Sequence, residues 1–174
     1  MLKDLLKQNR SEIIQIWFDL IIETYPADSS NFFKQTKNRF GNPVGHIISK
    51  EIEPLYDFLL SETNNDENLF RSLDNIIKIR SVQDFTASQA VNFVFLLKQA
   101  TRKYLNTRPD RKQMVDELLD FELKIDNLAL CAFDTYMKCK EKISEIRVNE
   151  SRRKTAILLE KINLTSGNPE QTKE

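Results

Sequence analysis

The sequence predicts an all-α fold, a single helical domain with a long C-terminal helix. Its 174 residues include only three glycines and five prolines, too few for the turns of a β-rich fold. Apolar residues recur every three or four positions along most of the chain, which is the period of an amphipathic helix. A hydrophobic content of 40%, with eleven phenylalanines, is enough for one packed core.

The N-terminal quarter predicts two helices. Apolar side chains at helical spacing indicate the first over residues 2–24, and Pro26 would stop it. A short second helix is expected to start at Ser29, which can cap it, and to fade at Asn38.

The octapeptide RFGNPVGH, residues 39–46, holds two of the three glycines in the chain and its single histidine. Gly41 suits the end of a helix, and Asn42 is a good N-cap for the next one. Pro43 fits the first helical position, where its missing N–H costs nothing. We therefore interpret Gly41, Asn42, Pro43 and Gly45 as a structural corner.

The middle of the chain predicts a bent helix followed by a straight one. The first covers residues 44–61 and contains Pro54, which would kink it by removing one hydrogen bond. The polar run 62–68 is a predicted loop. The second helix is expected over residues 69–82, where the apolar spacing resumes.

The last third of the chain is expected to be helical almost throughout. A capping-box pattern at residues 86–89 starts one helix. The final, or exit, helix covers residues 112–164 without glycine or proline, unless it breaks at the charged run 148–154. Residues 1–164 would then form one domain, and residues 165–174 a disordered tail.

Charge and hydropathy narrow the class of protein. Twenty-six basic and twenty-six acidic residues give a formal net charge of zero, so no global field attracts nucleic acid or anionic lipid. No segment approaches the ~18 uncharged apolar residues of a membrane span. The N-terminus lacks the pattern of a signal peptide. We expect a cytoplasmic protein that binds neither nucleic acid nor a membrane.

The residues available for chemistry are few. His46 is the single histidine, and Cys131 and Cys139 are remote from it in sequence, so a structural zinc site lacks its ligands. Without a second histidine, a nucleophilic serine or cysteine has no usual base. We expect no enzyme, no metal and no cofactor. A haem or small-ligand role for His46 is the alternative. Catalysis by the carboxylates of residues 116–126 is a weaker one, because such a helix face is usually solvated.

The exit helix carries a long apolar stripe, whose spacing of three, four and seven persists beyond what one domain can bury. We predict that it pairs with a second copy of the chain or with a partner protein. Packing against its own domain is the competing interpretation. The stripe consists of Ile125, Leu128, Ala132, Tyr136, Cys139, Ile143 and Ile146.

Three runs together resemble one family. They are RFGNPVGHII at 39–48, IIKIRSVQDFTASQAVNFVFLLK at 76–98 and LALCAFDTYMKCKEKISEIRVNESRR at 128–153. The chain resembles the N-terminal sensor domain of the RsbT co-antagonist proteins, the RsbR- and RsbRD-type subunits of bacterial stressosomes. The resemblance implies a globin-like helical fold without haem, a homodimer formed through the last helices, and an exit helix that joins a STAS output domain. It defines no catalytic residues.

The sequence departs from that family after the exit helix. It ends at Glu174, with no room for a STAS domain, so we expect a stand-alone copy of the sensor half. Such a copy would act in signal transduction or stress response through an unknown partner in trans, such as a STAS-type protein. The alternatives are a small-ligand or haem sensor and an adaptor that binds a partner through its C-terminal helix. Arg80 and Asp84 are expected either to pair across the core or to face a ligand.

Overall fold

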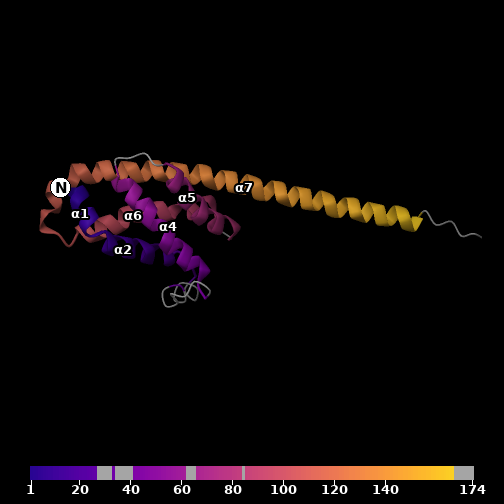
Figure 1. The fold of residues 1–174 in the computed structure, drawn as a ribbon, viewed down its shortest axis with the longest axis horizontal. Helices are drawn as coiled ribbons and strands as arrows, with labels where there is room; N and C mark the ends of the chain where they lie inside the picture. The colour runs from indigo at the N-terminus through magenta and orange to yellow at the C-terminus, as the bar shows by residue number, and fades with distance from the viewer. Residues whose placement is uncertain (27–32, 34–40, 62–65, 84, 167–174) are drawn as a thin grey trace, which may run out of the picture. The chain divides into compact units, whose positions relative to one another are not determined.

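A computed structural model describes residues 1–26, 33, 41–61, 66–83 and 85–166. Every regular element in these ranges is helical, which confirms the predicted all-α fold and the long C-terminal helix. The globin-like arrangement stays a prediction. In chain order the elements, shown in Figure 1, are α1 (Leu2–Gln8), α2 (Arg10–Ile22), α4 (Pro43–Leu60), α5 (Asp66–Val82), α6 (Ala87–Leu105), the 3-10 helix η1 (Pro109–Met114) and α7 (Val115–Ser166).

The N-terminal segment is two helices, so the prediction of one helix over residues 2–24 is wrong at Asn9. This residue leaves the helical region, with φ −109° and ψ 25°. Its side-chain Nδ2 donates to the carbonyl oxygen of Leu5 at 2.8 Å. Asparagine side chains compete with the helix for backbone groups in this way. The short helix expected over residues 29–38 lies outside the described residues, apart from Phe33.

The predicted corner begins α4 with a side-chain cap. The Oδ1 of Asn42 accepts a hydrogen bond from the backbone N–H of Gly45 at 2.8 Å, and Asn42 is almost fully buried. Its Nδ2 donates to the carbonyl oxygen of Phe33 at 2.9 Å. Pro43 occupies the first position of the helix. A Cβ added to Gly45 would lie 2.7 Å from Asn42 Oδ1, so the cap and the glycine depend on each other.

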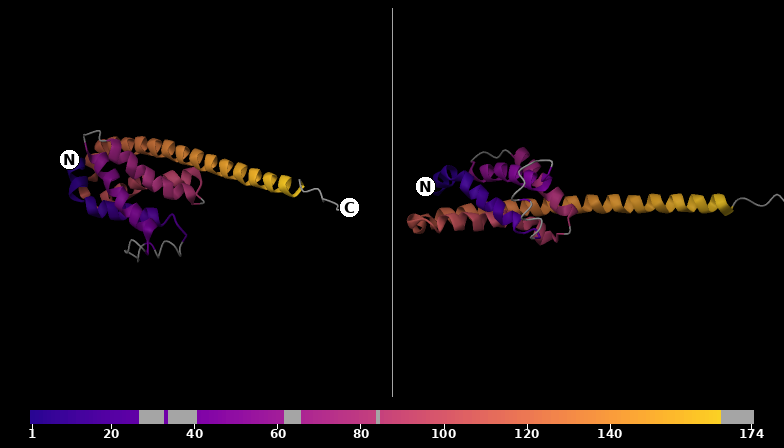
Figure 2. Two further views of the ribbon diagram at one scale, coloured as in Figure 1. Left: turned by 45° about the vertical axis from the view of Figure 1, so that its right-hand side comes forward. Right: turned by 90° about the horizontal axis from the view of Figure 1, so that it is seen from below.

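The remaining helices differ from the prediction at their ends: α5 begins at Asp66, inside the predicted loop, and η1 takes the first residues of the predicted exit helix. Because α7 continues to Ser166, the predicted tail is wrong for residues 165–166, and the rest of it lies outside the described residues. Pro54 lies inside α4, and the bend expected there stays a prediction. The capping box that begins α6 is confirmed, because the Gln89 N–H donates to Thr86 Oγ1 at 3.3 Å and the Thr86 N–H donates to Gln89 Oε1 at 2.9 Å. Figures 1 and 2 show α7 as one uninterrupted helix, so the break considered at residues 148–154 does not occur.

The core lies within residues Met1–Met137, which form one compact unit; Lys138–Glu174 form a second. In the first unit α2 packs against α6 and α4, and α4 packs against α5. Trp17 of α2 is fully buried and donates from Nε1 to the carbonyl oxygen of Phe93 in α6 at 2.7 Å. Among the described residues no helix has both the length and the apolar character needed to cross a membrane.

Candidate functional site

The first half of α7 is held to α6 by two ion pairs. Arg102 donates from Nε and Nη2 to the two carboxylate oxygens of Glu122, each at 2.6 Å, a bidentate geometry that fixes both position and orientation. These hydrogen bonds raise the pKa of Arg102. Four residues earlier in α6 and four later in α7, Lys98 Nζ lies 2.6 Å from Asp126 Oδ1. The two pairs show that α6 and α7 run antiparallel and set their register.

Part of the predicted partner stripe is buried within a single chain. Ile125, Leu128, Ala132 and Tyr136 are at most 5% exposed and contribute to the core of residues 1–137. This is the arrangement of the competing interpretation, in which the stripe packs against its own domain. In the second unit Cys139 and Ile143 are half-buried and Ile146 is exposed, and their role in binding a partner stays a prediction.

A second apolar stripe lies on the other side of α7, and the sequence reasoning missed it. At about 100° per residue its members fall within an arc of about 80°, roughly opposite Ala132. We call it the outer stripe. Its large apolar side chains are 41–66% exposed, and they are Leu119, Leu123, Leu130, Phe133 and Met137.

The outer stripe is bordered by α6. The Asp126 side chain lies within its arc, paired with Lys98. Lys98 Nζ also lies 5.9 Å from the ring centre of Phe95, which is itself 41% exposed. Contiguous exposed apolar side chains rimmed by charged groups are typical of protein interaction surfaces. The geometry therefore offers an interface formed by α7 with a contribution from α6.

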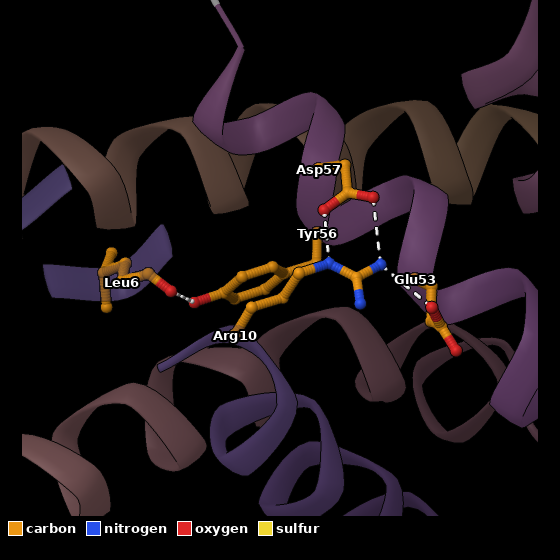
Figure 3. A network of polar contacts seen from close by, with 5 residues as sticks. All are labelled: Leu6, Arg10, Glu53, Tyr56 and Asp57. Atoms are coloured by element: carbon orange, nitrogen blue, oxygen red, sulfur yellow. Dashed lines mark hydrogen bonds and ion pairs between the residues drawn. The ribbon is translucent and has the colours of Figure 1, made fainter. Parts of the chain in front are cut away.

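A polar network fastens the start of α2 to α4. Arg10 donates to both carboxylate oxygens of Asp57, at 2.7 and 3.0 Å, and to Glu53 at 2.9 Å, and these bonds raise its pKa. Figure 3 shows the Arg10 guanidinium directed at both carboxylates, while Tyr56 points the other way. The Tyr56 hydroxyl donates to the carbonyl oxygen of Leu6 at 3.0 Å, and burial raises its pKa. The network holds α1, α2 and α4 together, and its charged groups are engaged with one another.

Arg80 lies at a junction of three helix ends. It is fully buried, with Nη1 donating to the Tyr25 hydroxyl at 3.3 Å. Its Nη2 donates to Thr24 Oγ1 at 3.3 Å and to the carbonyl oxygen of Gln89 at 3.0 Å. Its guanidinium carbon lies 4.3 Å from the ring centre of Phe85. We call these five residues the Arg80 junction; the expected pairing with Asp84 lies outside the described residues.

His46 lies in the first turn of α4, half-buried, and its backbone N–H donates to the carbonyl oxygen of Asn42 at 3.1 Å. Within the described ranges, no three His, Cys, Asp or Glu residues form a group that could hold a metal ion. Cys131 and Cys139 form no disulfide. The haem or small-ligand alternative for His46 stays a prediction.

Comparison with known proteins identifies the family of the chain. An uncharacterized protein of Archaeoglobus fulgidus is 23% identical over 147 residues, which cover 82% of this chain and 84% of the relative. No solved structure gives a significant match. Residues 11–151, which include α4, α5, α6 and all of α2 except its first residue, match the family described as "RsbT co-antagonist protein rsbRD N-terminal domain". The chain belongs to this family of regulatory domains, the RsbT co-antagonist protein rsbRD N-terminal domains.

Proposed function

We propose that the protein is a non-enzymatic regulatory domain that forms a homodimer through the outer stripe and transmits a signal along α7 to a partner protein. The observation that carries the proposal is the presence of two apolar faces on one helix. One face packs into the core of its own chain, and the other presents five large apolar side chains to solvent. Burying such a face in a symmetric contact is a common reason for a homodimer.

The connection of α7 to the core supports the relay. Glu122 is almost fully buried where it binds Arg102, so the first half of α7 follows any movement of α6. The same helix continues to Ser166. A ligand or partner that favours one packing of α6 would shift the population of α7 positions in the dimer. The second half of α7, with exposed side chains such as Ile157 and Leu158, would present that change to a cytoplasmic signalling protein in trans, of the STAS type or another class.

The test is the oligomeric state of three proteins, measured by native mass spectrometry at micromolar concentration. Leu130→Glu places a charge in the outer stripe, where the side chain is 66% exposed. Leu158→Glu is the matched control, because it makes the same change on the same helix at a leucine that is 59% exposed. We expect a dimer for the wild type and for Leu158→Glu, and a monomer for Leu130→Glu with unchanged helical circular dichroism.

Two results would contradict the proposal. A monomeric wild type would remove the dimer altogether. A dimer that survives Leu130→Glu but is lost in Leu158→Glu would place the dimer interface in the second half of α7.

A further inference from the structure

The Arg80 junction holds a buried cation without an anionic partner among the described residues. We propose that Arg80 is the recognition group of a binding site for a small carboxylate, which enters when the Phe85 side chain moves aside. Three features of the junction support this: the guanidinium has no anionic partner among the described residues, its Nε has no hydrogen-bond acceptor, and Phe85 covers it.

The charge balance is unusual for a protein interior. Arg80 is 0% exposed, and its hydrogen-bond acceptors are the hydroxyls of Thr24 and Tyr25 and the carbonyl of Gln89, all neutral. A buried charge is costly unless an opposite charge pairs with it. No described carboxylate forms an ion pair with Arg80, whereas Arg10 pairs with two carboxylates and Arg102 with one. An anion at the junction would supply the missing charge.

The Nε donor of the guanidinium remains available. Arg80 Nε is buried and has no hydrogen-bond partner, while both Nη atoms are engaged. Nearly all buried polar groups in proteins are hydrogen-bonded, so an orphaned N–H requires an explanation. A carboxylate oxygen at Nε would satisfy it with a charge-assisted hydrogen bond.

The walls of the site are aromatic. The guanidinium carbon lies 4.3 Å from the ring centre of Phe85, 5.3 Å from that of Tyr25 and 6.0 Å from that of Phe93. Such rings favour a ligand that carries a short apolar substituent next to its charge. A small organic acid fits this combination better than inorganic phosphate does.

Phe85 is placed to control access. It precedes the N-cap Thr86 of α6, and its side chain is half-buried, in contact with both solvent and Arg80. Its ring also packs edge-on against Tyr25, with centroids 5.2 Å apart. Rotation of this one side chain would expose Arg80 without disturbing the capping box.

The site is close to Trp17, whose fluorescence can report on binding. Trp17, the single tryptophan, donates to the carbonyl of Phe93, whose ring faces Arg80. Binding at the junction should therefore change tryptophan fluorescence. An effect of the ligand on α7 would rest on the function proposed above. Binding at Arg80 does not depend on that function. The fluorescence test of binding would therefore stay valid even if the wild type were a monomer.

The test is a fluorescence titration with propionate at constant ionic strength, with its neutral analogue propionamide as the ligand control. We expect a saturable change with propionate and none with propionamide. Arg80→Met retains an apolar stem beside Phe85 and removes the charge, and it should weaken half-saturation by about tenfold or more. Arg71→Met, which removes an exposed arginine of α5 outside the junction, should leave half-saturation unchanged. The Phe85→Ala protein should bind propionate more tightly or faster, because the aromatic ring that covers Arg80 is absent.

Three results would overturn the proposal. The first is the lack of a saturable propionate response in both the wild type and Phe85→Ala, which also decides the matter if Arg80→Met does not fold. The second is equal binding by wild type and a folded Arg80→Met. The third is binding that occurs only in Asp84→Asn, which would identify Asp84 as the internal counter-ion of Arg80.

Discussion

Trp17 of α2 and Phe93 of α6 are joined by a buried hydrogen bond of 2.7 Å, from the indole Nε1 to a carbonyl oxygen inside a helix. Seventy-six residues separate them in sequence, so the bond fixes a long-range contact between α2 and α6. The indole also fills the centre of the core, because Trp17 is fully buried. Its removal affects packing and hydrogen bonding together.

We expect Trp17→Phe to lower the free energy of unfolding by about 2–4 kcal/mol, from the lost hydrogen bond and the smaller ring. Urea denaturation followed by circular dichroism measures this. Phe70→Leu, at a residue of α5 that is 49% exposed, is the control and should change the free energy of unfolding by less than about 0.5 kcal/mol. Equal effects of the two substitutions would show that the Trp17 contact is not a main support of the core.

The effect of Gly45→Ala on the free energy of unfolding should change sign according to whether Asn42 is present. Gly45→Ala in the wild type would force the Asn42 side chain out of its capping position, because the new Cβ would lie 2.7 Å from Asn42 Oδ1. We expect a loss of about 1 kcal/mol in the free energy of unfolding, the usual value of an N-cap. In an Asn42→Ala background the space is open, and the same change should stabilise by up to about 1 kcal/mol through helix propensity. Equal effects in both backgrounds, measured by urea denaturation, would disprove the coupling.

The parts of the fold that the sequence predicts correctly are those formed by residues close together in the chain. The cap at Asn42 and the capping box of Thr86 and Gln89 involve residues three apart, so their sequence signature and their geometry coincide. The break at Asn9 is different. The helical pattern continues through it, and tertiary contacts near it, such as the bond from Tyr56 to the carbonyl of Leu6, come from fifty residues away.

The outer stripe and the Arg80 junction could not be predicted from the sequence, because both depend on tertiary contacts. The first half of α7 is apolar on two faces, and the spacing of Ile125 and Ala132 is as regular as that of Leu123 and Leu130. Only the fold decides which face the core covers. The neutral partners of Arg80 include Thr24 and Tyr25, which lie more than fifty residues before it. The sequence alone therefore could not predict that Arg80 has no carboxylate partner among the described residues.

Two buried tyrosines predict how stability responds to high pH. Burial raises the pKa of Tyr25 and of Tyr56 above the usual value, so folding favours the neutral phenol. In the unfolded chain these groups ionise near pH 10. Their stabilising contribution is complete below that pH and is lost as pH rises above it, because only the unfolded state releases the proton. We expect the free energy of unfolding to fall above about pH 10, and less steeply in Tyr56→Phe. Urea titrations at pH 8 to 11 measure the slopes; identical slopes in the two proteins would contradict the role of Tyr56.

A chain that ends after Lys140 separates dimerisation from relay. It keeps the compact unit Met1–Met137 and the whole outer stripe, so we expect it to fold and to remain a dimer in native mass spectrometry. It lacks the exposed second half of α7, including Ile157 and Leu158, and should lose any contact with a partner that the full chain retains. A monomeric product with intact helical circular dichroism would place the dimer contact beyond Lys140. In that case the outer stripe would need a different occupant, and Ile143 and Ile146, the part of the partner stripe that the truncation removes, would become the interface between the two copies.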